Sequence, residues 1–303
     1  MVTCDATIRS LLAMDLCRPT RLARGAVIDD TYEIGEQLGV GGMGRVYRAR
    51  DRRLGRDVAI KLHASFARAD AARKDDPLRR EASVLARLSH ANVVTVYTTG
   101  TWSDQPWVAM EYVPGTARSW LAAEPRTKHE IVAIYVAAGR GLAAAHAAGL
   151  VHCDFKPENV LVGDDGRVRV ADFGLARECD DGGEDGWVGS GTPVNMAPEQ
   201  HAGAGVGPAT DQFAFAVTLW EALTGHRPFA GSTSRELVNA KIAPPKRPLE
   251  RHIERALRRA LEADPAARWP SMTALLDALI DVAPRRTRRT RKASNAGASR
   301  RVS

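Results

Sequence analysis

Residues 152–159 read HCDFKPEN, and residues 172–174, which begin 13 positions after Asn159, read DFG. Together they offer a carboxylate that can accept the proton of a hydroxyl group, a lysine that can neutralise a phosphoryl group during transfer, and amide and carboxylate oxygens that suit Mg²⁺. Taken one at a time, Pro157, Asn159 and Asp172 are equally typical of turns. Their combination at these spacings instead predicts a site for phosphoryl transfer.

A glycine-rich turn lies upstream, where residues 38–46 read LGVGGMGRV. In dinucleotide-binding units such glycines open a helix, whereas here Val46 and Tyr47 resume a strand, which predicts a hairpin. Glycines allow the backbone to lie close to phosphate oxygens with its N–H groups facing them. By itself the motif is also compatible with a plain hairpin turn.

Lys61 ends an apolar run that begins at Val58. An ammonium group in a cleft can hold polyphosphate oxygens as a point charge; the alternative is a surface lysine whose aliphatic stem lies along the sheet. The glycine-rich turn, whose last glycine, Gly44, lies 17 residues before Lys61, favours the first interpretation. Glu81 lies in a predicted helix, where it can pair with Lys61 or face solvent.

Strand and helix patterns are segregated along the chain. Alternating and β-branched segments predict strands in the first part, at residues 32–38, 45–50, 57–63, 93–99 and 106–112. A helix over 77–88 interrupts them, and the second part reads as helices over 131–149, 213–223, 250–262 and 271–282. This order predicts an α+β fold in two lobes.

The net charge of +7 does not describe the body of the protein. Residues 284–303 carry seven Arg, one Lys and no acid, so the preceding 283 residues are nearly neutral and a nucleic-acid-binding domain is not indicated. With no apolar periodicity, this basic tail is predicted to be disordered. We expect it to be solvated, with contact to anionic lipid or nucleic acid and phosphorylation of its Ser and Thr residues as alternatives.

Cysteine usage and hydropathy predict a compartment. The four cysteines form no CxxC pair, which favours a reduced, cytoplasmic protein over a disulfide framework or a zinc site. The first residues lack the basic region of a secretory signal, and no run of 18 apolar residues occurs, so no transmembrane segment is expected.

In combination these motifs resemble the eukaryotic-type protein kinase family, and its bacterial serine/threonine branch in particular. GVGGMGRVYRARD from residue 39 and GTPVNMAPEQ from residue 191 look very like that branch. The resemblance covers about 32–282 and implies a bilobal fold. Its N-lobe, about 32–113, would hold a five-stranded sheet and one main helix, and its C-lobe, about 114–282, would be helical, between an N-terminal leader (1–31) and the tail (283–303).

The resemblance also implies an ATP site in the cleft between the lobes. Lys61 would hold the α- and β-phosphates while paired with Glu81, and the backbone of the linker at Glu111 and Val113 would meet the adenine, with Met110 as gatekeeper. The residues that would cover the phosphates are Leu38, Gly39, Val40, Gly41, Gly42, Met43, Gly44, Arg45 and Val46.

The resemblance assigns the catalytic roles in the same way. Asp154 would orient and deprotonate the acceptor hydroxyl, and Lys156 would contact the γ-phosphate. Asn159 and Asp172 would hold Mg²⁺, with Mn²⁺ as an alternative metal. Outside the site itself, Glu199 is expected to pair with Arg268, and Asp211 is expected to be buried at the start of the central C-lobe helix.

Two positions depart from the family pattern. Cys153 stands where most members carry the Arg that receives a phosphate on the activation segment, and a neutral thiol cannot do so. The segment itself carries five acids between Glu178 and Asp185, which would repel a further dianion. We therefore expect activity without activation-segment phosphorylation. Asn195 replaces a family Tyr, which can alter the floor of the peptide-binding site.

The function that the resemblance implies is transfer of the ATP γ-phosphate to Ser or Thr hydroxyls of protein substrates in bacterial signalling, with autophosphorylation possible. The alternatives are a small-molecule phosphotransferase with the same lobed architecture and a nucleotide-binding scaffold without catalysis. The Ala197-Pro198-Glu199 motif favours protein substrates, and the presence of Lys61, Asp154 and Asp172 argues against a scaffold.

Overall fold

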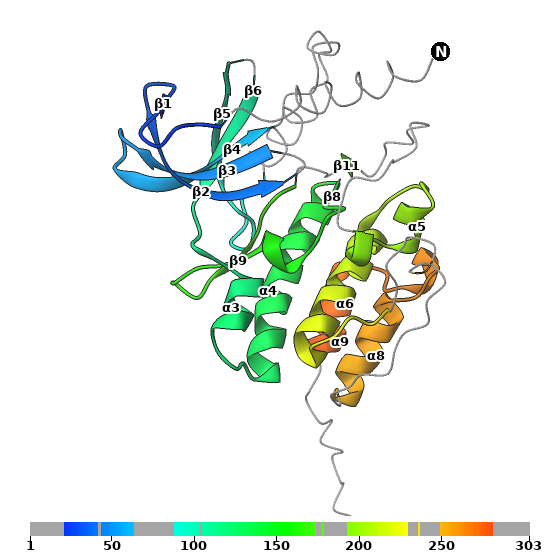
Figure 1. Ribbon diagram of the computed structural model, residues 1–303. Helices are drawn as coiled ribbons and strands as arrows, with labels where there is room; N and C mark the ends of the chain where they lie inside the picture. Colours follow the sequence, from blue (N-terminus) through cyan, green and yellow to red (C-terminus); the bar gives the residue numbers. More distant parts are fainter. Residues whose placement is uncertain are drawn as a thin grey trace, which may run out of the picture.

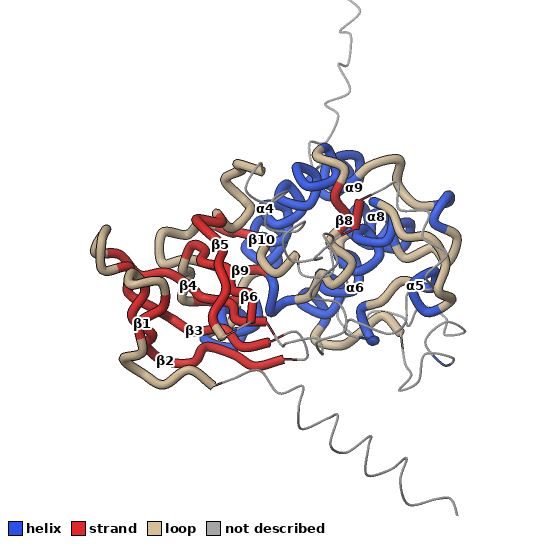
Figure 2. The backbone as a smooth tube through the Cα atoms, turned by 90° about the horizontal axis from the view of Figure 1, so that it is seen from above, coloured by secondary structure: helices blue, strands red, loops and turns tan. Residues whose placement is uncertain are grey.

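The computed structural model describes residues 21–41, 44–63, 88–103, 105–173, 177–178, 193–229, 236 and 249–280. The β-sheet of the first part lies above the helices of the second part in Figure 1, and seen from above the strands gather at one end and most of the helices at the other (Figure 2). The predicted α+β fold in two lobes is therefore confirmed.

The N-lobe is an antiparallel sheet with the strand order β1-β2-β3-β4-β6-β5. All five strands predicted from the sequence form. Their bounds are Tyr32–Gly41 (β2), Gly44–Asp51 (β3), Arg56–His63 (β4), Val96–Trp102 (β5) and Gln105–Glu111 (β6). The expectation of five strands is corrected by a sixth, β1 (Val27–Ile28), because two residues are too few to show strand periodicity in a sequence.

Residues 21–31, which the sequence analysis placed in a leader, contribute to the core of this sheet. The side chains of Leu22 and Ile28 are buried in one apolar cluster with Tyr47 and Trp107. The backbone N–H of Leu22 also donates to Tyr47 Oη at 3.1 Å. Ile60 and Leu62 point into the same cluster, so Lys61 between them faces the opposite side of the sheet.

Ile28→Ala is expected to lower the free energy of unfolding by about 2–5 kcal/mol, because it removes a fully buried side chain and leaves a cavity. The measurement is urea denaturation of the whole chain. Leu54→Ala is the matched control, since Leu54 is 68% exposed and its truncation should cost little. Equal stability of the two variants would show that β1 does not belong to the folded core.

The C-lobe is built around α6 (Pro208–Thr224), whose Phe215, Leu219 and Trp220 are fully buried. The long helix α4 (Lys128–Ala147) packs against both α6 and α9 (Met272–Ile280), and α8 (Arg251–Ala260) packs against α6 and α9. These four helices confirm the four that the sequence predicted for this part. The predicted helix over 77–88 lies outside the described residues except for Leu88, which is not helical.

Several short strands and helices complete the described part of the C-lobe. A three-stranded sheet has the order β10-β9-β7, with bounds Gly115–Thr116 (β7), Val160–Val162 (β9) and Val168–Val170 (β10). β8 (Leu150–Val151) pairs with β11 (Arg177–Glu178). Other helical elements within the described ranges are α3 (Ala117–Ala123), α5 (Pro198–His201), η1 (Pro157–Asn159), η2 (Pro193–Asn195) and η3 (Pro265–Ala267).

Within the described ranges, none of the helices combines the length and the apolar character that a membrane span requires.

Candidate active site

The loop 152–159 is held from below by a buried carboxylate. Asp211, in the first turn of α6, accepts the backbone N–H of His152 on Oδ2 at 2.8 Å and that of Cys153 on Oδ1 at 2.9 Å. His146 Nε2 lies 2.7 Å from the same Oδ2. Burial would raise the pKa of Asp211, but the hydrogen bond from His146 and the neighbouring charges outweigh this and keep the pKa low. These bonds hold Cys153 at φ 64°, a left-handed conformation that is unfavourable for a side chain other than glycine. The expected buried aspartate is confirmed.

Two further hydrogen bonds tie this loop to the neighbouring segments. Gln200 Nε2 donates to the carbonyl of Cys153 at 2.8 Å, and His152 Nε2 lies 3.0 Å from the carbonyl of Ala171. The sequence analysis did not single out Gln200, because a glutamine after the Ala197-Pro198-Glu199 motif carries no signal that it reaches a residue 47 positions away. The loop is thus fixed both to α5 and to the strand that leads to Asp172.

Asp154, Lys156 and Asn159 lie together, as predicted. Lys156 Nζ donates to Asp154 Oδ2 at 2.6 Å, and Asn159 Nδ2 donates to the carbonyl of Asp154 at 2.9 Å. The backbone N–H of Ala171 donates to the carbonyl of Asn159 at 2.9 Å. Through this last bond Asp172 is placed next to the loop.

Lys61 and Asp172 meet across the two lobes. The buried Lys61 Nζ, on β4 of the N-lobe, forms an ion pair with Asp172 Oδ1, which follows β10 of the C-lobe. Burial would raise the pKa of Asp172, but the charge and the hydrogen bond of Lys61 outweigh it and lower the pKa to about 2. Asp172 is therefore ionised at neutral pH. Glu81, the predicted partner of Lys61, lies outside the described residues.

The glycine-rich turn is the hairpin between β2 and β3. Gly39 pairs with Val46, Val40 with Arg45 and Gly41 with Gly44. Gly44 requires glycine: it has φ 143°, and a Cβ there would lie 2.1 Å from the carbonyl oxygen of Leu62. Leu38 and Val40 are exposed, and a Cβ at Gly39 or Gly41 would meet no atom within 4 Å, so this strand leaves open space beside it. Gly42 and Met43 lie outside the described residues.

The linker joining the lobes (residues 111–114) runs from the end of β6 to β7. The backbone N–H of Glu111 donates to the carbonyl of Thr95 at 2.8 Å. The Glu111 side chain, which the sequence analysis did not consider, forms an ion pair with Arg169 on β10 at 2.7 Å. Met110 and Val113 are half-buried on either side of it.

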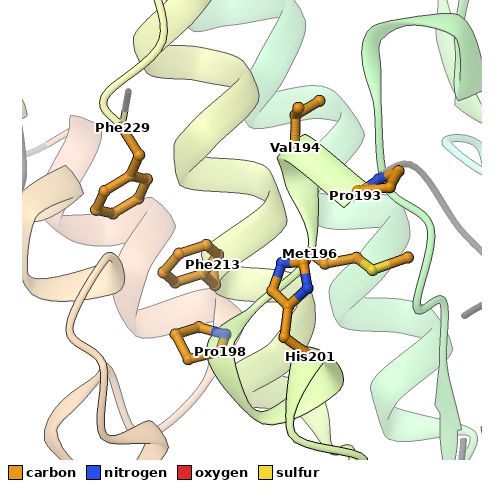
Figure 3. Close-up of a pocket in the computed structure, with 7 residues that line it drawn as sticks. All are labelled: Pro193, Val194, Met196, Pro198, His201, Phe213 and Phe229. Atoms are coloured by element: carbon orange, nitrogen blue, oxygen red, sulfur yellow. The ribbon is translucent and has the colours of Figure 1, made fainter. Parts of the chain in front are cut away.

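The segment 193–201 is held to the C-lobe by the predicted pair of Glu199 and Arg268. The guanidinium of Arg268 donates to both Glu199 oxygens, at 2.7 and 2.8 Å, and both side chains are buried. Beside this pair the segment lines a small apolar pocket together with the stacked rings of Phe213 and Phe229 (Figure 3). Asn195, the residue that replaces a family Tyr, is itself buried.

The oxygen atoms of Asn159 and Asp172 are suitable ligands for a hard divalent cation. Asn159 and Asp172 provide an amide and an ionised carboxylate, and oxygen ligands of this kind are what Mg²⁺ takes from proteins when phosphate oxygens and water complete its shell. Lys61 of the N-lobe and Lys156 of the C-lobe both add positive charge near Asp172. The arrangement can therefore bind a metal–polyphosphate and place a carboxylate beside it.

Comparison with known proteins places the chain in a family. The model of the protein kinase domain matches residues 32–294. The serine/threonine-protein kinases PknL and PknB of Mycobacterium tuberculosis are 37% and 39% identical over 220 residues each, which is 72% and 68% of this chain. The chain covers 55% of the length of PknL and 34% of that of PknB.

The fold comparison agrees. The crystal structure of the Mycobacterium tuberculosis PknI kinase domain matches with a TM-score of 0.63 and 31% sequence identity, over 86% of this chain and 98% of that one. The match spans both lobes. The chain belongs to the protein kinase domain family.

Proposed function

We propose that this chain is a serine/threonine protein kinase that transfers the γ-phosphoryl group of ATP to Ser or Thr hydroxyls of protein substrates. The observation that carries the proposal is the ion pair of Lys61 with Asp172, which joins the two lobes next to Asp154 and Lys156. PknL and PknB are named serine/threonine-protein kinases, which supports the same acceptor class.

Each residue has a role in the proposal. Lys61 binds the α- and β-phosphates, and the hairpin residues 38–46 cover them with backbone N–H groups. Asp154 accepts the proton of the acceptor hydroxyl while Lys156, 2.6 Å from it, neutralises charge on the transferred group. Asn159 and Asp172 would hold Mg²⁺, or Mn²⁺ in its place, and such a metal would supply positive charge beside the phosphates.

The test is incubation of the whole chain with γ-labelled ATP, Mg²⁺ and a generic protein acceptor, followed by acid hydrolysis to identify the labelled amino acids. The expected result is label on phosphoserine or phosphothreonine, and no label when EDTA is present during the incubation. Label that passes only to small hydroxyl compounds would instead favour a small-molecule phosphotransferase. ATP binding without any transfer would favour a scaffold.

Activity is expected to be independent of phosphorylation of the activation segment. Cys153 supports this, because its neutral thiol presents no cation to a phosphate. The side chain is also buried, with Sγ 3.7 Å from the carbonyl oxygen of Val151. Ser190, a hydroxyl residue between the DFG motif and Ala197-Pro198-Glu199, lies in the activation segment and outside the described residues. Ser190→Ala should therefore keep the wild-type kcat in the transfer assay, with fold and ATP binding checked in parallel. A variant that folds and binds ATP but no longer turns over would contradict this expectation.

We place the chain in the cytoplasm in this proposal, in line with its cysteine pattern and with ATP as the phosphoryl donor. The basic tail, residues 283–303, lies outside the described residues. Its Thr287, Thr290, Ser294 and Ser303 each have an Arg or Lys two or three residues earlier and are proposed as sites of autophosphorylation. Removal of the tail should then lower the phosphate incorporated per chain.

A further inference from the structure

A buried arginine connects the linker of the two lobes with the strand that leads to Asp172. Arg169 lies in the middle of β10, and its side chain is only 5% exposed. Burying a guanidinium group destabilises the folded state unless acceptors pair with its N–H groups. The partners of Arg169 therefore show what holds it in place.

Each nitrogen of the Arg169 guanidinium has an acceptor. Nε contacts Glu111 Oε1 of the linker at 2.7 Å. The two terminal nitrogens donate to the two carboxylate oxygens of Asp165, at 3.3 and 3.0 Å, and one of them also to the carbonyl of Arg167 at 3.3 Å. The planar fork of arginine suits such an arrangement, whereas a lysine could not reproduce it. Arg169 therefore bridges an N-lobe carboxylate and a C-lobe carboxylate.

Gly163 lies directly beside this bridge. A Cβ at Gly163 would lie 2.5 Å from Asp165 Oδ1 and 3.2 Å from a terminal nitrogen of Arg169. No side chain can therefore stand at this position unless the carboxylate moves. The absence of a side chain at Gly163 leaves the room in which the Asp165 carboxylate meets the guanidinium.

Backbone hydrogen bonds run parallel to the bridge. Val170 donates its N–H to the carbonyl of Asn92 and accepts the N–H of Val94, both at 2.9 Å. The next residue, Thr95, accepts the N–H of Glu111 at 2.8 Å. The backbone of Glu111 is thus fixed through residues 92–95, and its side chain is fixed through Arg169, both relative to the same strand.

We infer that Arg169 is a positioning residue for the nucleotide: through Glu111 it sets the linker backbone against which the adenine would bind. Asp172 follows Arg169 by three residues and lies just after the end of β10. This segment would therefore align the adenine end of ATP through Arg169 and the metal–phosphate end through Asp172. The inference rests on the proposed function, because it assigns the linker to the adenine.

Arg169→Gln should raise KM for ATP on the order of tenfold while changing kcat much less, since a misplaced binding surface weakens binding but leaves Asp154 in place. Inhibition by adenosine, which lacks phosphates, should weaken to the same degree. Inhibition by Mg²⁺-tripolyphosphate, which lacks the adenine, should stay at the wild-type level. This division separates positioning of the linker from general damage to the fold.

Arg167→Gln is the matched control. Arg167 lies two residues away and donates to the same Asp165, but its side chain is 63% exposed and it contacts no linker residue among those described. It should keep wild-type KM, kcat and inhibition by both probes. Arg169→Lys keeps the charge without the fork and should give an intermediate KM; it also carries the comparison if Arg169→Gln does not fold.

Wild-type KM for ATP in both Arg169 variants would overturn the inference, as would an equal weakening of adenosine and tripolyphosphate. These outcomes are distinct from a failure of the proposed function. If the proposed function fails, the wild-type chain itself would neither turn over ATP nor respond to the two inhibitors.

Discussion

Asp154→Asn is expected to lower kcat of phosphoryl transfer by at least about 10²-fold. The amide keeps the shape of the carboxylate and can still accept the hydrogen bond from Lys156, which lies 2.6 Å from Asp154 Oδ2. It cannot take the proton of the acceptor hydroxyl. Binding of ATP should change little, because Lys61 and Asp172 meet without Asp154. The loss should therefore fall on kcat, and the measurement is the rate of label transfer at saturating ATP.

The matched control for this substitution is Asp164→Asn. Asp164 is exposed in the turn between β9 and β10, so the same chemical change there should leave the transfer rate unaltered. If Asp154→Asn transferred phosphate as fast as the wild type and as Asp164→Asn, another group would have to act as the base. Loss of ATP binding in Asp154→Asn would show that the effect is on the fold of the cleft.

Glu199→Gln is expected to lower the free energy of unfolding by about 3–5 kcal/mol, the cost of leaving one member of a buried ion pair without its counter-charge. Arg268 is completely buried and donates to both Glu199 oxygens. Thr210 Oγ1 also donates to Glu199, at 2.9 Å. A neutral amide can accept fewer of these bonds, and it leaves the guanidinium charge uncompensated. Urea denaturation gives the difference.

Glu254→Gln provides the comparison on the surface. Glu254 pairs with Arg258 one helical turn away at 2.8 Å, but both side chains are about a third exposed, and such pairs contribute roughly 0.3–0.5 kcal/mol. Adding Arg268→Met to Glu199→Gln should restore part of the lost stability, because it removes the unpaired charge. A Glu199→Gln variant no less stable than Glu254→Gln would refute a structural role for the pair.

The fold followed from the sequence for most elements long enough to show their period, although the seven-residue helix α3 was not predicted. α6 is apolar on nearly all sides and lies in the centre of the C-lobe, and the strands that alternate or are β-branched form the N-lobe sheet. β1 and β7 to β11 were not predicted, because two or three residues show no period. The burial of Leu22 and Ile28 was missed for the same reason, since it depends on β1 pairing with β2.

The site followed from the sequence where chemistry and spacing were local. Asp154, Lys156 and Asn159 lie within six residues of one another, and the loop geometry brings them together. Lys61 and Asp172, 111 residues apart, were predicted to share a site, but their direct contact was not part of the prediction. Gln200 and Arg169 were not predicted at all, because their partners lie on other elements.

The sequence by itself thus determined the family, the two lobes and the identity of the charged groups in the cleft. Only the tertiary structure decided how those groups pair. The reason is physical: hydrophobic periodicity and short motifs are properties of neighbouring residues, whereas the pairing of buried charges depends on which strand, loop and helix end meet in space. The bridge from Glu111 through Arg169 to Asp165 exists because the end of β6 and the turn after β9 approach the same side of β10.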